Sequence, residues 1–361
     1  MTAKLLDIIV GTRPNFVKAA PLLRRLSQPD VSAHVTPRLI HTGQHYDAAM
    51  NATFFTQLGL PDPDIHFHAG RSGATVAEQT GIILRRYEAV LADAKCDACL
   101  VFGDVTSSLA AALSAKRARV PVIHYEAGVR SGETFMQEEI NRLAIDAISD
   151  WFLTTSRFAV ETLRASGVQK DKIFQVGNLM ADCLIDHEDQ LTLPTDVGLP
   201  ASDFALATVH RPENVDDPTR LQSLVHAVAS VGLPIIFPAH PRTAQRLQGL
   251  EIPAEIKLIE AQPYLSFVGL MKASRLLVTD SGGAAEEATV LGTPCVTLRD
   301  AYEAKETLTH GTNHLAGTDP QTIRAVCQTA LAKGRQPRRP DGWDGNSAQR
   351  IVDLLPRLLG S

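Results

Sequence analysis

Aromatic residues are scarce in this chain, at 5% of its 361 amino acids. So few aromatic side chains cannot form an extensive base-stacking surface. The formal charge of −5 gives no basic excess to attract nucleic acid or an anionic membrane. No apolar run approaches the roughly 20 residues that a membrane helix needs. We therefore expect neither nucleic acid nor a membrane among the partners.

Cysteine is also rare. The five cysteines are Cys96, Cys99, Cys183, Cys295 and Cys327. Because Asp7 interrupts the first apolar run, the N-terminus is predicted to be a strand and not a signal peptide, which indicates a cytoplasmic protein. An odd number of cysteines without a signal favours reduced thiols. Cys96 and Cys99 have redox or zinc spacing, but no second Cys/His pair follows at zinc-finger distance, so no metal is expected.

Length and apolar patterning predict an α/β protein with two Rossmann-like domains facing a central cleft. Strands alternate with amphipathic helices in both halves, which implies right-handed βαβ units and parallel sheets. We expect one domain at 1–185, a second at 200–345, and a helix within 346–361 in position to cross back to the first. The expected strands include 5–10, 99–102, 120–124, 204–209, 235–237, 257–259, 276–279 and 295–298. Asp217 is expected to cap a helix that has Pro218 in its first turn.

A strand in the second half runs directly into Thr279-Asp280-Ser281-Gly282-Gly283, and a helix is predicted from Ala284 to Leu291 with its end at Gly292. Such a turn leaves N–H groups at a helix N-terminus, where the dipole favours a phosphate and glycine lets it approach closely. The carboxylate of Glu287, under two turns into the helix, can reach sugar hydroxyls. This indicates half of a nucleotide-sugar site. The alternative is an ordinary strand–turn–helix connection with a solvated glutamate pair.

A second loop of this kind, Gly11 to Lys18, lies where the first strand ends and the first helix begins. Arg13 and Lys18 bring two cations to a helix N-terminus, which suits a diphosphate. Pro21 indicates that the helix either starts late or is kinked there. The alternative is a loop with two surface cations.

Several motifs occur in one order along the chain: 11–18, 42–47, 103–105, 124–128, 138–142, 208–214, 238–242 and 280–287. As an ordered set they resemble the non-hydrolysing UDP-N-acetylglucosamine 2-epimerases, over about residues 5 to 317. That family interconverts the sugar nucleotide and its manno epimer, has two Rossmann-like domains of the glycosyltransferase-B type, and usually forms dimers. The resemblance therefore implies a homodimer that takes a UDP-sugar and needs no metal or redox cofactor.

The resemblance also implies residue roles. The acid–base carboxylates are Asp104, Glu126 and Glu138, and His210 is a catalytic group near the leaving phosphate. The diphosphate is held by Arg13, Lys18 and His240, and phosphate and ribose by Ser281, Gly282, Gly283 and Glu287. A second, activating UDP-sugar is bound in bacterial members at positions matching Gln44, His45 and Arg211.

The residues alone leave alternatives open at these positions. Asp104 and Glu126 follow strands, where acids are commonly solvated or capping residues. Glu138 and Glu139 suit the first turn of a helix, which favours acids through its dipole. Gln44 and His45 suit buried polar loop anchors.

The chemistry of the implied reaction explains the residue types. The hydrogen on C2 of the sugar is not acidic until the anomeric C1–O bond to UDP breaks and an oxocarbenium-like centre forms. A carboxylate then removes that hydrogen to give a 2-acetamidoglucal, and a proton returned to the other face inverts C2 when UDP adds back. The site therefore needs cations and dipoles for the diphosphate, carboxylates for the protons, and exclusion of water.

The chain departs from the family pattern at the sugar end, at Gln137, at Ala285 and at Ala304-Lys305. These departures raise the alternative of a modified substrate, such as an acidic or amino-substituted N-acetylglucosamine derivative. Two further alternatives are a glycosyltransferase of the same fold and a nucleotide-sugar sensor without turnover.

Overall fold

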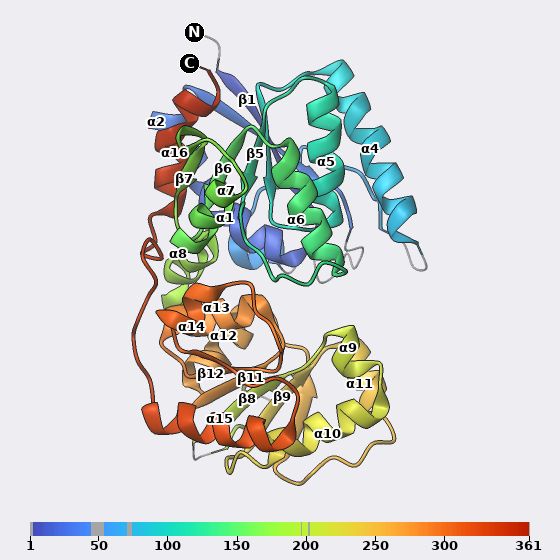
Figure 1. Cartoon of the computed structure of the whole chain (residues 1–361), viewed down its shortest axis with the longest axis vertical. Helices are drawn as coiled ribbons and strands as arrows, with labels where there is room; N and C mark the ends of the chain where they lie inside the picture. The colour runs from blue at the N-terminus through green and yellow to red at the C-terminus, as the bar shows by residue number, and fades with distance from the viewer. Residues whose placement is uncertain (1–2, 45–53, 71–73, 196, 201–202, 361) are drawn as a thin grey trace. The chain divides into compact units, whose positions relative to one another are not determined.

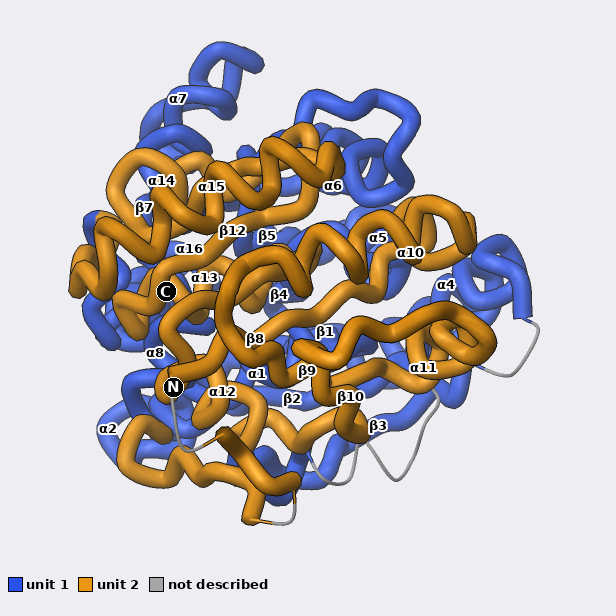
Figure 2. Tube along the Cα trace, turned by 90° about the horizontal axis from the view of Figure 1, so that it is seen from below, with its two compact units in different colours: residues 1–186, 341–361 blue, residues 187–340 orange. Residues whose placement is uncertain are grey.

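The computed structural model describes residues 3–44, 54–70, 74–195, 197–200 and 203–360 (Figure 1). Contacts divide the chain into two compact units (Figure 2). Unit 1 comprises residues 1–186 and 341–361, and unit 2 comprises residues 187–340. The chain therefore leaves unit 1, builds unit 2, and returns to unit 1 for its last helix, α16.

Unit 1 is built on a parallel sheet. Its strands are β1 (Lys4–Val10), β2 (Val35–His41), β3 (Ile65–His66), β4 (Ala98–Phe102), β5 (Val122–Tyr125), β6 (Trp151–Thr154) and β7 (Ile173–Gln175). Its helices are α1 (Arg13–Leu26), α2 (Pro29–Ser32), α4 (Val76–Asp93), α5 (Thr106–Arg117), α6 (Gln137–Ile148), α7 (Arg157–Ala165), η1 (Lys170–Lys172), α8 (Leu179–Asp186) and α16 (Ser347–Leu358). The described strands lie in the order β3-β2-β1-β4-β5-β6-β7, with each neighbouring pair parallel.

Both faces of this sheet are covered, because its central strands are apolar on both sides. In β1, all side chains from Leu6 to Val10 are buried. A strand of this kind needs helices on both faces. The helices α1, α8 and α16 pack against one another on one face, and α4, α5 and α6 on the other (Figure 1). The charge of buried Asp7 is balanced by Arg38, whose guanidinium donates to its two oxygens at 2.7 and 2.8 Å.

The helix α1 begins directly after β1. The side-chain oxygen of Asn15 accepts hydrogen bonds from the N–H groups of Gly11 and Thr12, at 3.1 and 3.2 Å, which fixes the turn. Pro21 lies inside this helix. The alternative in which the helix starts late at Pro21 is therefore wrong.

Unit 2 is built on a second parallel sheet, whose described strands lie in the order β10-β9-β8-β11-β12-β13. Its strands are β8 (Ala205–Thr208), β9 (Ile235–Ala239), β10 (Ile256–Glu260), β11 (Leu276–Thr279), β12 (Cys295–Thr297) and β13 (Asn313–Leu315). Its helices are η2 (Glu188–Gln190), α9 (Pro212–Val215), α10 (Pro218–Ala229), α11 (Pro241–Leu247), α12 (Tyr264–Ala273), α13 (Gly282–Leu291), α14 (Lys305–Thr309) and α15 (Pro320–Lys333).

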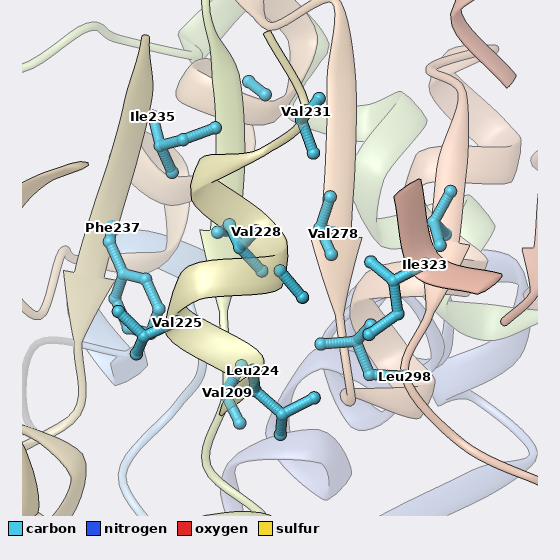
Figure 3. Packing of buried hydrophobic residues seen from close by; sticks show 14 of the residues in the cluster. Val209, Leu224, Val225, Val228, Val231, Ile235, Phe237, Val278, Leu298 and Ile323 are labelled. Carbon is cyan, nitrogen blue, oxygen red and sulfur yellow. The ribbon is translucent and has the colours of Figure 1, made fainter. Parts of the chain in front are cut away.

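Each face of the second sheet carries its own apolar core. On one face α10 and α15 pack against a cluster that includes Val278 of β11 and Leu298, the residue after β12, as Figure 3 shows around Val228. On the other face α12 and α13 cover a cluster that includes Leu277 and Ala288. The predicted cap of α10 is confirmed, since Asp217 accepts hydrogen bonds from two N–H groups of its first turn, at 2.9 and 3.2 Å.

Both sheets have a topological switch point. In unit 1 the chain moves from β1 outward to β3 and then resumes at β4, on the other side of β1. In unit 2 the same reversal occurs between β8 and β11. At such a point the loops that follow the two strands diverge, and α/β proteins bind ligands there.

Candidate active site

At the switch point of unit 1, a lysine from α1 meets a glutamate that follows β5. Lys18 Nζ lies 2.6 Å from Glu126 Oε2, and both side chains are largely buried, with exposed fractions of 10% and 15%. The ammonium therefore balances the carboxylate where water has little access. This pair joins two of the residues that the sequence singled out.

The backbone of Glu126 is in the left-handed region, with a φ of 70°. A residue with a Cβ adopts this conformation at a cost of about 1–3 kcal/mol, and such residues concentrate at functional sites. The N–H group of Glu126 donates to the carbonyl of Leu153 at 3.0 Å, which holds the residue in place. Gly103, whose φ is 59°, lies against the same carboxylate: a Cβ there would be 2.7 Å from Glu126 Oε2. Only glycine fits this approach.

Asp104 follows Gly103 and is held by α6. Its carboxylate forms an ion pair with the guanidinium of Arg142, and its carbonyl accepts a hydrogen bond from Asn141 Nδ2 at 2.7 Å. The Asp104 side chain is 23% exposed, whereas that of Arg142 is 6% exposed. The carboxylate of Asp104 is thus partly exposed, while its backbone is held in place by α6.

Arg142 is itself held by Glu139, the second residue of the glutamate pair. Its Nη1 lies 3.0 Å from Glu139 Oε2, and that oxygen also accepts hydrogen bonds from the N–H and hydroxyl groups of Ser131 at 2.9 and 3.0 Å. Burial raises the pKa of Glu139, but the bonds from Ser131 and Arg142 outweigh it and hold that pKa below its usual range. Glu138 differs, because its side chain in the same first turn is exposed.

Arg13 and Gln44 follow the neighbouring strands β1 and β2 of unit 1. Arg13 is the first residue of α1, and its guanidinium carbon lies 5.8 Å from the centre of the Phe54 ring. Gln44 Oε1 accepts hydrogen bonds from the N–H and hydroxyl groups of Ser107, at 3.1 and 2.7 Å, at the start of α5. These bonds favour the loop-anchor interpretation of Gln44. His45 lies outside the described residues.

At the switch point of unit 2, His210 and Asp280 form a pair. His210 follows β8, Asp280 follows β11, and His210 Nδ1 lies 2.9 Å from Asp280 Oδ1. Asp280 is fully buried, while the His210 side chain is 44% exposed. Because a carboxylate accepts only, Nδ1 carries the hydrogen and Nε2 is the nitrogen left to face a substrate.

Asp280 also holds the backbone around His210. Its oxygens accept hydrogen bonds from the N–H groups of His210 and Arg211 at 3.1 and 2.9 Å, and from Asn214 Nδ2 at 3.0 Å. Burial raises the pKa of Asp280, but its hydrogen bond to His210 and these donors outweigh burial, so the pKa is lowered. The sequence placed Asp280 within a motif but assigned it no role; a buried acid directly after a strand was the available signal.

The predicted phosphate loop begins α13. Ser281 is the N-cap, and its hydroxyl accepts from the N–H of Ala284 at 3.3 Å. Gly282 and Gly283 form the first turn, where N–H groups have no carbonyl partner within the helix. The hydroxyl of Tyr302 donates to the carbonyl of Gly282 at 2.7 Å and steadies the turn. Tyr302 is thus a supporting residue that the motif pattern did not predict.

Glu287 lies deeper in the same helix. It is 6% exposed, and burial raises its pKa from the usual 4.5 to about 7, against the opposing effect of a hydrogen bond with Tyr264. A carboxylic acid in this state holds its proton near neutrality and releases it when donors arrive.

The two remaining predicted residues of unit 2 lie closer to solvent. His240 follows β9, is exposed, and accepts a hydrogen bond from the N–H of Arg242 at 3.4 Å through Nδ1. Arg211 is partly exposed and its Nη1 lies 2.9 Å from Glu213 Oε1. Burial lowers the pKa of Arg211, but Glu213 and neighbouring acids outweigh that effect and raise it.

Other features of the described residues bear on ligands and location. The five cysteines are free and buried. Across the described ranges, no group of three or more His, Cys, Asp or Glu side chains is arranged to hold a metal ion. No helix in this part of the chain is long and apolar enough to span a membrane.

Two Rossmann-type sheets, each with charged side chains and a helix N-terminus at its switch point, define an α/β enzyme that acts on nucleotide sugars. Residues 29–356 match the family model described as UDP-N-acetylglucosamine 2-epimerase. The chain belongs to this family, and it is an isomerase of the sugar-nucleotide 2-epimerase type.

Similar proteins span almost the whole chain. A UDP-2,3-diacetamido-2,3-dideoxy-D-glucuronate 2-epimerase of Pseudomonas aeruginosa is 38% identical, covering 97% of this chain and 99% of that protein. A UDP-N-acetylglucosamine 2-epimerase of Methanocaldococcus jannaschii is also 38% identical, covering 97% and 98%. The crystal structure of the M. jannaschii enzyme with UDP-GlcNAc and UDP has a TM-score of 0.89 at 36% identity, covering 98% of this chain and 99% of that one.

The fold itself is shared more widely. The glycotransferase of kitacinnamycin has a TM-score of 0.59 at 13% identity, covering 99% of this chain and 100% of that one. At this identity the likeness concerns the fold alone. It agrees with the glycosyltransferase-B type of fold that the sequence predicted.

Proposed function

We propose that this enzyme interconverts UDP-N-acetylglucosamine and UDP-N-acetylmannosamine by eliminating UDP and adding it back through a 2-acetamidoglucal. The observation that carries the proposal is the pair of acids at the unit 1 switch point. Asp104 and Glu126 adjoin one glycine, Gly103, and each is ion-paired with a cation, Arg142 or Lys18. Two carboxylates held this way suit the removal of a proton from C2 and its return to the opposite face.

In this proposal the residues of unit 1 carry the acid–base steps and part of the positive charge for the diphosphate. Asp104, partly open, and Glu126, largely buried, are the acid and base at C2, and Glu138 is a third candidate from the exposed first turn of α6. Arg13 and Lys18 supply positive charge toward the diphosphate. Because Lys18 also pairs with Glu126, its charge serves both groups.

The residues of unit 2 bind and release UDP in this proposal. The N–H groups at Ser281, Gly282 and Gly283 face a phosphate, as the helix dipole favours. His210, oriented by Asp280, points Nε2 at the leaving oxygen, and His240 lies at the end of the neighbouring strand β9. Glu287 accepts hydrogen bonds from ribose hydroxyls. Arg211, together with Gln44 and His45 of unit 1, would bind a second UDP-sugar, and Gln44 would do so in addition to the bonds with which it anchors its loop.

Exchange of the C2 hydrogen tests the proposed reaction. With UDP-N-acetylglucosamine in deuterated water, we expect deuterium at C2 of both epimers, detected by NMR and mass spectrometry. A glycosyltransferase would show no exchange but would transfer the sugar to an added acceptor. A sensor would bind UDP and leave every sugar unchanged. Either of those two results would overturn the proposed reaction.

A modified sugar is the second candidate substrate. The P. aeruginosa relative acts on a diacetamido glucuronate and the M. jannaschii relative on the parent sugar, at the same identity. Of the departures at the sugar end, Ala285 and Ala304 are packed within the apolar core, so their side chains serve packing, whereas Lys305 is exposed. This favours the parent sugar. Comparing kcat/KM for UDP-N-acetylglucosamine with its uronic-acid and diacetamido analogues decides between the two candidate substrates. If the parent sugar were inert while a derivative reacted, the derivative would be the substrate of the same reaction.

Glu287 should make both stability and UDP binding depend on pH. Its pKa is higher folded than unfolded, so the folded state binds the extra proton and loses stability as pH rises from 4.5 to 7. A shift of this size corresponds to about 3 kcal/mol. We expect Glu287→Gln to be more stable than the wild type above pH 7, and equally stable near pH 4, in urea denaturation.

UDP binding should show the opposite trend. Ribose hydroxyls donate to the ionised carboxylate, so wild-type affinity should rise as pH increases through 7, with protons released on binding. Calorimetry in two buffers measures that release. Glu287→Gln is the matched control, because it removes the titration of Glu287 and leaves every other titrating group of the site in place. Identical pH profiles for the two proteins would remove Glu287 from the ribose site.

We propose a homodimer as the working form. Ile140 and Leu143, one turn apart on α6, are 51% and 47% exposed, and Leu113 on the adjoining α5 is 39% exposed. Apolar side chains gathered on neighbouring helices suit contact with a second copy. Light scattering should give twice the chain mass of 39.0 kDa. A mass of one chain at micromolar concentration would contradict the dimer.

A further inference from the structure

A buried histidine close to Asp104 and Glu126 has an oxygen acceptor at each of its two ring nitrogens. His124, in β5, is fully buried. Its Nδ1 lies 2.7 Å from Asp146 Oδ1, and its Nε2 lies 2.9 Å from the carbonyl oxygen of Gly103. Neither a carboxylate nor a carbonyl can donate, so the ring donates to both of them when each nitrogen carries a hydrogen. Asp146 then balances the charge of the ring.

Asp146 connects this ring to the turn that follows Glu126. Its second oxygen accepts a hydrogen bond from the N–H of Gly128 at 3.0 Å and pairs with Arg130 Nη2 at 2.7 Å. Burial raises the pKa of Asp146, but the charges of His124 and Arg130 outweigh it and lower that pKa. One buried carboxylate thus holds the 126–128 turn directly and the 103–104 turn through His124.

We propose that His124 and Asp146 are positioning residues that set the carboxylate of Asp104 relative to that of Glu126. The Gly103 carbonyl that His124 holds belongs to the peptide bond leading into Asp104, and the Gly103 Cα faces Glu126 Oε2. Rotation of that peptide would move Asp104 while Glu126 stays fixed by Leu153. Neither His124 nor Asp146 touches substrate in this role.

The same helix supports Asp104 at three points. Asn141 bonds its carbonyl, Arg142 its carboxylate, and Asp146 acts on the preceding peptide through His124. All three lie on α6, so a shift of this helix would move the acid as a unit. Displacements near 1 Å at catalytic groups cost about 10²-fold in rate.

Two substitutions of His124 separate positioning from mere packing. In His124→Gln, the amide nitrogen can occupy the place of Nε2 and donate to the Gly103 carbonyl. In His124→Asn, the shorter amide can reach Asp146 only. Neither amide is charged, so the difference between the two variants sets the bond to Gly103 against the bond to Asp146. We expect His124→Asn to lose about 10²-fold in kcat, and His124→Gln to retain at least tenfold more activity than His124→Asn.

The inference rests on the proposed epimerase reaction, so the wild type is first shown to exchange the C2 hydrogen. UDP affinity should be unchanged in both variants, because the UDP residues proposed in unit 2 are untouched. Equal kcat values for His124→Gln and His124→Asn, with wild-type exchange intact, would overturn the positioning role while leaving the reaction standing. Absent exchange in the wild type would instead refute the proposed function.

A measurement on the wild-type protein remains decisive where a variant does not fold. In ¹⁵N-labelled protein, the His124 ring should show one-bond N–H coupling at both nitrogens at pH 7.5. Asp146→Asn should remove the coupling at one nitrogen, because its amide can present a hydrogen to Nδ1. A wild-type ring with a single N–H would overturn the arrangement described above.

Discussion

Replacing Asp104 by asparagine is expected to lower kcat by ~10²–10⁴-fold, the usual contribution of a positioned acid or base. Asparagine keeps the size and the backbone bond from Asn141, but it neither removes a proton from C2 nor balances Arg142. UDP affinity should change little, because the UDP residues proposed in unit 2 are unaffected. Steady-state kinetics and calorimetry with UDP measure the two quantities.

The matched control is Glu133→Gln, an exposed acid in the loop before α6. It removes the same charge and should keep kcat within about twofold, since surface changes away from the site have small effects. Glu138→Gln, tested alongside, reports whether the exposed member of the glutamate pair takes part. A near-normal kcat for Asp104→Asn would refute its assignment as an acid–base group.

Asp280→Asn is expected to impair both activity and stability. The carboxylate orients His210 through Nδ1 and accepts from the N–H groups of His210 and Arg211. In Asp280→Asn, the NH₂ group replaces a carboxylate oxygen, so a donor then faces some of these N–H groups and they lose their acceptor. Each buried donor left without its acceptor costs about 1–3 kcal/mol. The histidine tautomer is no longer fixed, so kcat should fall by about 10²-fold or more.

Urea denaturation and kcat measure these two effects together. The control is Asp216→Asn, an aspartate of unit 2 whose ion pairs with Arg242 and Arg246 are exposed. Exposed pairs contribute about 0–1 kcal/mol, so this variant should be close to wild type in both measurements. If Asp280→Asn were equally mild, His210 would not depend on that carboxylate.

The loops that carry chemistry could be predicted from sequence because each lies within a few residues of a strand end. The family prediction from the ordered motifs is confirmed, and the strand–turn–helix at 276–291 was predicted with its end at Gly292, whose φ is 71°. Local signals of this kind depend on glycine, on capping residues and on the periodicity of apolar residues. A single segment of sequence contains all three.

The supports of those loops could not be predicted, because they come from elements distant in sequence. Arg142 reaches Asp104 from α6, and Asp280 reaches His210 from β11. Glu138 and Glu139 are adjacent in sequence, yet only Glu139 is buried, since neighbours on a helix point in different directions. Which of the two faces Arg142 depends on how α6 packs, which the local sequence does not contain.

The return of the chain to unit 1 for α16 has a consequence for folding during synthesis. Ile351, Leu355 and Leu358 of α16 are buried in unit 1, in a helix that packs on α1 and α8. The helices α1 and α8 leave the ribosome early, but α16, which covers their apolar surfaces, is synthesised only after all of unit 2. At 5–20 residues per second, that delay is on the order of 10–30 s. During this interval the nascent chain exposes the apolar surface that α16 later covers, to which a chaperone can bind, and unit 2 can fold before unit 1 is complete.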